Sequence, residues 1–243
     1  MLFVATSGAA QTLLAQGANS HNLANAATPG FKADLSQFRS MPVFGAGLPS
    51  RVYAMSERPG FDLAPGALQT TGRDLDVAVD GDGWIAVLAR DGTEAYTKRG
   101  DLQLTLNGML TTGAGDPVLG NGGPIAVPPA EKVEIGSDGT ISVRLVGQDS
   151  KSLAAVDRLK LVRLPAGQLV KGEDGLFRLS DGAVAPADAQ VRLVSGALEA
   201  SNVNAVEALV QMITLARQFE LQVKMMETAR SNDAASSQAM RLG

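Results

Sequence analysis

The feature that most constrains the fold is the last fifth of the chain, from Leu198 to about Met240. After Asn204 it contains neither Gly nor Pro until the final residue. Ser201 or Asn202 can cap a helix here, because a short polar side chain accepts a hydrogen bond from a first-turn N–H. Apolar residues then recur in alternating steps of three and four, which predicts one apolar stripe along a helix. The stripe comprises Leu209, Met212, Ala216, Phe219, Val223 and Met226.

A second apolar row, Val206, Val210 and Ile213, widens this stripe at its N-terminal end. A helix over most of the segment would be about 50 Å long, which is more than a small domain needs. The pattern alone leaves two interpretations open. Either the helix packs on the core of its own chain, or its apolar stripe is covered only when neighbouring chains bind.

The N-terminal segment, residues 1 to about 27, also has helical composition, and Thr28-Pro29-Gly30 is expected to end it. Leu13 and Leu14 form an apolar ridge in it. Phe3, Ala10, Gly17 and Ala24 lie near the same face. Gly8 and Gly17 each cost a helix about 1 kcal/mol, but they let another backbone come close. No charged residue precedes Lys32, so we expect this surface to become buried.

The middle of the chain changes character twice. Four Pro and four Gly residues between Phe31 and about Thr70 prevent long helices and favour an extended arm. From Thr71 to about Gly196 apolar residues alternate with polar ones, and Asp91-Gly92, Asn107-Gly108 and Ser137-Asp138-Gly139 are hairpin signals. Many short strands with closely spaced turns predict an antiparallel β domain.

The expected fold class is therefore α+β. The N- and C-terminal helices form a coiled helical unit, with a central antiparallel β domain and an irregular extended arm. The expected domains are a helix over 1–30, the arm over 31–70, the β domain over 71–196 and a helix over 197–243.

Composition excludes several functions. The chain of 243 residues has no cysteine and a single histidine, His21, which excludes disulfides, thiolate metal sites and multi-histidine metal centres. Its net charge of −4 comes from well-mixed charges, unlike the basic surface of a nucleic-acid binder. No apolar run reaches the ~20 residues of a membrane helix. The N-terminus lacks the basic start of a signal peptide, although a cleaved signal ending near Ala26 or Ala27 stays an alternative.

Three stretches together resemble the axial proteins of the bacterial flagellum, the rod and hook family. The first is NSHNLANAATPGFKAD, residues 19 to 34. The second is LDVAVDGDGWIAV with AYTKRGDLQLTLNGMLTT. The third is LVSGALEASNVNAVEALVQMITLARQFE. They occur in family order and cover both ends and the middle. Within the family, the length and Trp84 favour the proximal rod type over the distal rod type, which stays an alternative.

The resemblance implies a structural protein without cofactor, metal or catalytic group. It would leave the cell uncleaved through the flagellar export apparatus and polymerise with copies of itself and other rod proteins. The product would be the periplasmic drive shaft that transmits torque to the hook, with the terminal helices inside. The expected assembly interface comprises Leu13, Leu14, Asn22, Leu23, Asn25, Pro29, Gly30, Phe31, Leu209, Met212, Ile213, Ala216, Phe219, Val223 and Met226.

Two other classes compete with a structural role. Asp74, Asp76, Asp80 and Asp82 could be read as a calcium site or a catalytic carboxylate pair, but no acidic residue stands at the twelfth position of an EF-hand loop. Asp80 and Asp82 flank a glycine and more simply serve a turn. A lone His21 without an evident acidic partner favours an interface residue over a base. A secreted β-rich binding module would need an exposed aromatic platform, whereas Trp84 sits in an apolar run that favours the core.

Overall fold

The computed structural model describes residues 2–42, 52–145 and 153–240. The chain divides into two compact units. The first, the helical unit, consists of Met1–Ala26, Ala33–Asp62 and Val203–Gly243. The second, the β unit, consists of Ala27–Lys32 and Leu63–Asn202. Two terminal helices and a central antiparallel β region confirm the expected α+β class.

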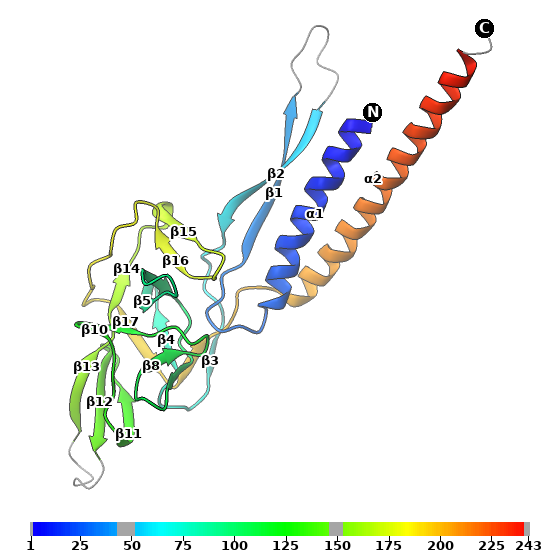
Figure 1. Cartoon of the computed structure of the whole chain (residues 1–243). Helices are drawn as coiled ribbons and strands as arrows, with labels where there is room; N and C mark the ends of the chain where they lie inside the picture. The colour runs from blue at the N-terminus through cyan, green and yellow to red at the C-terminus, as the bar shows by residue number, and fades with distance from the viewer. Residues whose placement is uncertain (1, 43–51, 146–152, 241–243) are drawn as a thin grey trace. The chain divides into compact units, whose positions relative to one another are not determined.

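The helical unit pairs the two ends of the chain. Helix α1, Leu2–Ala24, packs against helix α2, Ala205–Ala239. Strand β1, Asp34–Pro42, pairs antiparallel with β2, Val52–Phe61, and this ladder lies against α1 (Figure 1). The segment expected as an extended arm thus contains a two-stranded antiparallel ladder.

Helix α1 packs through its smallest residues. Its buried face carries Ala5, Ala9, Thr12, Ala15 and Ala18. A Cβ added at Gly8 would lie 3.0 Å from Nε2 of Gln222 on α2, so glycine permits this close approach. The larger Leu13 and Leu14 lie on the opposite, exposed face.

The N-cap of helix α2 lies three residues after the first candidate, Ser201. Asn204 is the N-cap, and its side chain accepts hydrogen bonds from the backbone N–H groups of Val206 and Glu207. The expectation that Ser201 or Asn202 would cap the helix is wrong. The backbone N–H of Asn202 donates to Phe31 O at 3.3 Å, which holds this segment in an extended path before the helix starts.

The β unit consists of short strands. They are β3 Leu68–Thr70, β4 Val77–Asp80, β5 Gly83–Leu88, β6 Glu94–Thr97, β7 Leu102–Leu104, β8 Leu110–Thr112, β9 Leu119–Gly120, β10 Gly123–Pro124, β11 Ala130–Ile135, β12 Thr140–Leu145, β13 Ala154–Arg158, β14 Leu161–Arg163, β15 Leu169–Lys171, β16 Phe177–Leu179, β17 Arg192–Ser195 and β18 Ala197–Glu199, with a 3-10 helix, η1, at Ala166–Gln168.

All described ladders are antiparallel. The largest sheet has the order β14-β5-β6-β16-β15, and a second has the order β11-β12-β13. Strand β3 pairs with β18 and β4 with β17, so the beginning and the end of the β unit lie side by side. The core is aliphatic, as the low aromatic content predicts, and includes Val77, Ile85, Leu102, Leu110 and Ile141.

The predicted turns fall between strands. Gly92, Gly108 and Gly139 each have a positive φ, between 76° and 86°, at the β5–β6, β7–β8 and β11–β12 connections. Asp80 and Asp82 are exposed and flank Gly81, whose φ is 70°, at the β4–β5 turn. Their position is that of turn residues.

Candidate assembly surfaces

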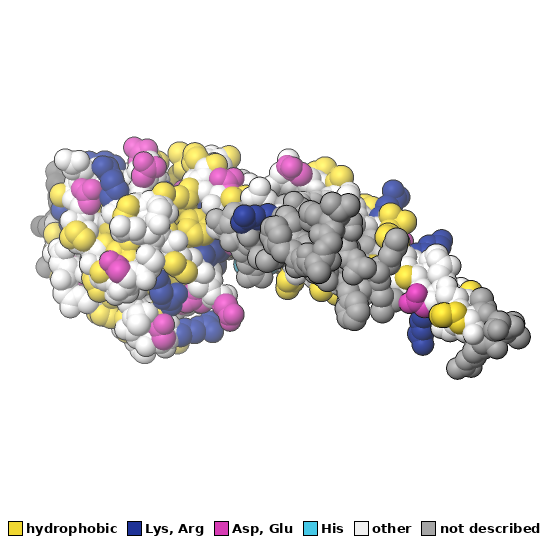
Figure 2. Space-filling model, turned by 90° about the horizontal axis from the view of Figure 1, so that it is seen from above, with side chains coloured by type: hydrophobic (Ala, Val, Ile, Leu, Met, Phe, Trp, Pro, Cys, Tyr) yellow, Lys and Arg dark blue, Asp and Glu magenta, His cyan; other side chains and the backbone are white. Residues whose placement is uncertain are grey.

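Both terminal helices expose large apolar side chains. On α1, Leu13 is 51% exposed and Leu14 is 55% exposed. On α2 the exposed apolar residues are Val206, Leu209, Val210, Ile213, Leu221 and Met225. We call these residues, together with Leu13 and Leu14, the outward apolar face, which has one part on each helix. The space-filling view shows yellow hydrophobic side chains at the surface of the helical unit, between white atoms and a few charged groups (Figure 2).

The predicted stripe of α2 divides between two sides of the helix. Leu209 is exposed. The others, Met212, Ala216, Phe219, Val223 and Met226, are half-buried. They share a side with the buried Ala208 and Leu215. That side faces α1, where the Thr6 hydroxyl lies 3.4 Å from the Met226 sulfur.

Two buried polar contacts between α1 and α2 fix how the helices lie along one another. The buried Thr12 hydroxyl is 2.9 Å from Gly8 O and 3.1 Å from Gln222 Oε1. The buried Asn19 Nδ2 donates to Ala208 O at 2.7 Å. Buried polar groups that lose their partners are costly, so these pairs favour one antiparallel register over slipped ones.

The end of α1 is tied to β1 by asparagine and histidine. Asn22 donates to Asp34 O and accepts from Asp34 N, both at 2.8 Å. Nδ1 of His21 lies 2.7 Å from Asp34 Oδ2, an acidic partner that the sequence did not reveal. Asn25 Nδ2 donates to His21 O at 2.9 Å, and Leu23 is half-buried.

A buried charge cluster lies inside the β unit. Lys32 Nζ is 2.6 Å from Glu199 Oε1, and Lys98 Nζ is 3.9 Å from Glu199 Oε2. We call Lys32, Lys98 and Glu199 the lysine–glutamate cluster. The same Glu199 Oε1 accepts the backbone N–H of Gly66 at 3.0 Å, and Lys32 Nζ also donates to Ala64 O at 2.8 Å. Three distant segments of the chain therefore meet at one carboxylate.

The motif Pro29-Gly30-Phe31, part of the family resemblance, lies beside this cluster. Pro29 is half-buried, while Gly30 and Phe31 are buried. Gly30 has φ +67° and donates to Glu199 O at 2.7 Å. Lys171 Nζ lies 4.0 Å from the centre of the Phe31 ring. These motif residues make contacts within the β unit, so a role for them in assembly stays a prediction.

Lys32 and Glu199 lie in two different stretches that carry the family resemblance, and neither stretch by itself indicates that they pair. Periodicity could not pair them, because they are 167 positions apart. A usable signal was Lys32 itself, the first charge in the chain, directly after a buried Gly-Phe pair.

A pocket of about 800 Å³ opens beside the lysine–glutamate cluster. Its wall includes all three cluster residues and Trp84. Trp84 is only 3% exposed and packs on Phe177, with 4.6 Å between ring centroids. It is therefore a core residue that reaches the pocket wall and not an exposed aromatic platform.

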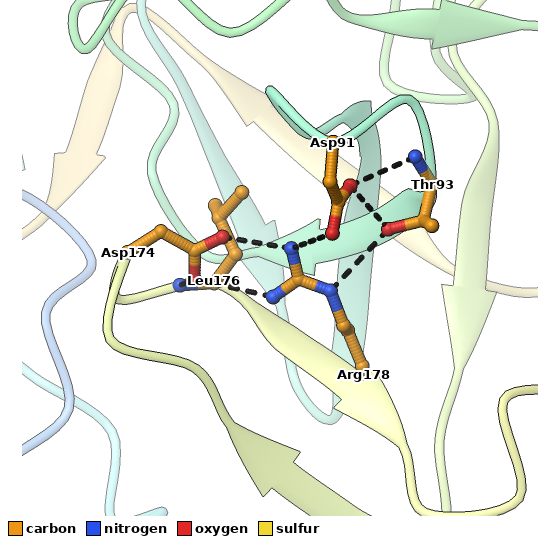
Figure 3. Close-up of polar contacts among 5 residues, drawn as sticks. All are labelled: Asp91, Thr93, Asp174, Leu176 and Arg178. Carbon is orange, nitrogen blue, oxygen red and sulfur yellow. Dashed lines mark hydrogen bonds and ion pairs between the residues drawn. The ribbon is translucent and has the colours of Figure 1, made fainter.

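Arg178 joins two turns of the large sheet (Figure 3). Its guanidinium donates to Asp174 Oδ2 at 2.7 Å and lies 3.4 Å from Asp91 Oδ2. Hydrogen bonding to Arg178 lowers the pKa of Asp174, and hydrogen bonding to Thr93 lowers the pKa of Asp91. The group ties the β5–β6 turn to the β15–β16 turn, where β16 and β6 share only the Phe177–Tyr96 pair.

No described helix is both long and apolar enough to cross a membrane. Within residues 2–42, 52–145 and 153–240, no group of three or more His, Asp or Glu side chains is placed to hold a metal ion. The visible face of the β unit mixes acidic and basic side chains (Figure 2).

Comparison with known proteins agrees with this architecture. The family profile described as "Flagellar hook protein FlgE/F/G D1 domain" matches residues 78–143 in the β unit. The profile described as "Flagellar basal body rod FlgEFG protein C-terminal" matches residues 194–239, which include α2.

Full-length relatives extend these matches. The chain is 43% identical to the flagellar basal-body rod protein FlgF of Escherichia coli (strain K12), covering 99% of this chain and 98% of that protein. Identity and coverage are the same for FlgF of Salmonella typhimurium. It is 34% identical to the flagellar basal-body rod protein FlgG of Bacillus subtilis, over 86% of this chain and 87% of that protein. With this identity along nearly its whole length, the chain belongs to the FlgF-like family of flagellar basal-body rod proteins.

Proposed function

We propose that this chain is a structural subunit of the proximal flagellar rod, and that its outward apolar face forms the contacts between subunits. The proposal rests on which residues of the two helices are buried in the helix pair and which are exposed. Small residues of α1 close the helix pair, while Leu13, Leu14 and Ile213 stay exposed. An exposed apolar face of this kind is typical of a protein that completes its packing in an assembly.

Head-to-tail contacts that do not close into a ring produce helical assemblies. Burying each large apolar side chain of the outward face would contribute about 1.5–3 kcal/mol. Several such residues on each subunit would hold a stiff shaft without any catalytic group. The half-buried residues Phe219, Val223 and Met226 would support this face indirectly, because they hold α2 against α1.

The partners in this proposal are copies of the chain and other rod proteins. The chain would reach them through the flagellar export apparatus, without removal of a signal peptide. The protein would act in the periplasmic part of the basal body and would need no cofactor. An enzymatic role has less support. Of the four acidic residues considered for one, Asp74, Asp80 and Asp82 are exposed, and the buried Asp76 lies 3.5 Å from Arg73.

The test is to place glutamate on the outward face. Leu13→Glu and Ile213→Glu should leave the chain folded, because both side chains are more than half exposed, at 51% and 57%. Each should abolish rod assembly, since an unpaired charge buried between helices costs several kcal/mol. The assays are motility, and the amount of the chain in purified basal bodies from a bacterium that lacks its own copy of the gene.

Gln218→Glu is the matched control, because it adds the same charge at an exposed polar position of α2. Secretion of every variant is measured separately, so that failed export is not mistaken for failed assembly. If Leu13→Glu and Ile213→Glu are exported and build rods as well as Gln218→Glu, the outward apolar face is not the contact between subunits.

A further inference from the structure

The β7–β8 hairpin ends in an uncharged, apolar tip at the surface of the β unit. Leu106 is the second residue of its turn, 105–108, and its side chain is fully exposed. Leu104 and Met109 beside the turn are each 37% exposed, and no charged residue occurs from 102 to 112. Surface turns favour Gly, Pro, Asn, Asp and Ser, so the turn does not explain this leucine. We call residues 104–109 the hairpin tip, and exposed apolar side chains that lie together are typical of contact sites.

The hairpin tip is held in place by hydrogen bonds. The backbone N–H of Thr105 donates to Met109 O, and that of Gly108 donates to Thr105 O, both at 2.9 Å. From outside the hairpin, the backbone N–H of Val127 donates to Gly108 O at 2.7 Å. A fixed tip loses little conformational entropy when it binds, so Leu106 is presented ready for contact.

The pocket beside the lysine–glutamate cluster has a balanced set of charges. The charged residues of its described wall are Lys32, Lys98, Arg163, Asp80, Asp82 and Glu199. Lys32 lies 2.6 Å from Glu199. The carboxylates of Glu199, Asp82 and Asp80 favour the charged form of Lys98. Arg163 lies 3.8 Å from Asp188. Every cation of this wall has a counter-charge, so the pocket suits an uncharged occupant.

The rest of the described wall is apolar. Apart from the charged residues, it consists of glycine and apolar side chains. Trp84 and Leu169 are buried in it, whereas Leu68 and Ala166 are exposed to solvent. The volume of about 800 Å³ lies within the range of about 300–1,000 Å³ typical of ligand pockets. The pocket therefore has room for the apolar side chains of a hairpin tip.

We infer that the hairpin tip of one copy of this chain inserts into the pocket of a neighbouring copy and places Leu106 among its apolar side chains. Of the described residues that line the pocket, none comes from 102–112, so the hairpin does not fill the pocket of its own chain. Tip and pocket are different surfaces of one unit, and such head-to-tail contacts produce helical assemblies when they do not close into a ring. This inference rests on the proposed function and adds a contact made by the β unit, separate from the outward apolar face.

Leu106→Ser tests the hairpin tip. It should fold with unchanged stability, because the side chain is fully exposed. Losing one buried leucine weakens a contact by about 10-fold or more, and the amount of the chain in purified rods should fall by a similar factor. Val184→Ser is the matched control, because Val184 is an exposed apolar residue of the β unit outside the described wall of the pocket. It should enter rods like the unchanged chain, and secretion of both variants is measured separately.

Introduced cysteines test which surface receives the tip, because the chain has none of its own. Asn107 lies next to Leu106 in the turn, and Ala166 belongs to the pocket wall; both are exposed. Purified rods that contain the double variant Asn107→Cys and Ala166→Cys are treated with a bifunctional maleimide. We expect covalent dimers and longer multimers of the chain. The control pair, Asn107→Cys and Val184→Cys, should give few of them.

The outcomes separate this inference from the proposed function. Normal incorporation of Leu106→Ser overturns the inference, and so does equal cross-linking of the two cysteine pairs. Loss of Leu106→Ser from rods without cross-linking between Asn107→Cys and Ala166→Cys would mean that the tip binds another rod protein, which also overturns the contact between copies. These results leave the proposed function standing, whereas absence of the unchanged chain from purified rods would overturn the proposed function itself.

Discussion

Lys32 and Glu199, which are 167 positions apart in the sequence, meet at 2.6 Å in the interior of the β unit. The contact joins the segment that enters this unit to the segment that leaves it. Lys98 approaches the same carboxylate from a third segment. The stability of this junction therefore depends on one negative charge between two positive ones.

This arrangement predicts an order of stabilities. Glu199→Gln should lower the free energy of unfolding by about 3–5 kcal/mol, because it removes the carboxylate that pairs with the buried Lys32 at 2.6 Å. Lys32→Met should cost less, since Glu199 keeps Lys98 and the Gly66 N–H as partners. Lys98→Met should cost least, because Lys98 Nζ is 3.9 Å from Glu199 and makes no hydrogen bond to that carboxylate. Urea denaturation followed by Trp84 fluorescence measures all three, and a larger loss for Lys98→Met than for Glu199→Gln would contradict the charge argument.

Substitution by alanine should change the stability in opposite directions at Gly30 and Gly17. At Gly30, with φ +67°, a Cβ would collide with the backbone of Lys98, so Gly30→Ala should destabilise the β unit by more than about 2 kcal/mol. At Gly17, a helix position with nothing within 4 Å of an added Cβ, alanine should stabilise the chain by about 1 kcal/mol. Thermal unfolding of the two variants is the measurement. A stabilised Gly30→Ala would mean that the turn tolerates an L-residue.

Arg178 should make the stability of the β unit fall more steeply as the pH is lowered. The pKa of Asp174 is lowered first by its hydrogen bond to Arg178, and the pKa of Asp91 first by Thr93 and further by Arg178. Carboxyl groups with a lowered folded-state pKa stabilise the fold above their unfolded value of 3.8, and this contribution is lost as the pH falls below it. In Arg178→Gln, the urea midpoint should therefore fall less between pH 6 and about pH 3. An unchanged pH dependence would show that the carboxylates are held by other groups.

Tyr96 should resist ionisation. Burial is the main cause that raises its pKa from 10.0 to about 12. Its hydroxyl oxygen accepts the backbone N–H of Ala185 at 2.7 Å. A raised folded-state pKa means that the unfolded chain ionises first, so the fold loses stability as the pH rises above 10. In Tyr53→Phe, where Tyr96 is the remaining tyrosine, the phenolate absorbance should appear near pH 12 or together with unfolding. Titration at the ordinary value would mean that Tyr96 is reached by solvent.

The sequence predicted the parts of the fold that depend on local pattern. Asp91-Gly92 and Asn107-Gly108 predicted hairpins because glycine there adopts a positive φ, and both turns join the strands expected. The apolar run around Trp84 predicted a place in the core, and β5, which contains it, is buried along nearly all of its length.

The sequence could not show which face of each helix would be used inside the chain. Leu13 and Leu14 look like the natural core of α1, yet the pair closes through Ala9 and Thr12, because small residues let α2 come closer. The sequence also could not show which residue is the N-cap of α2. Asn202 and Asn204 are equally good caps by composition, but Asn202 instead donates to Phe31 O and Ala64 O.

The helix pair has a consequence for the order in which the chain folds. Thr6 and Met226, which meet across the two helices, are 220 positions apart. A chain that is delivered from its N-terminus cannot close this contact until nearly all of it has been released. The β unit, whose contacts lie between these positions, can fold earlier. In such a chain the helix pair can form only after both helices are present, which makes it a late step in folding.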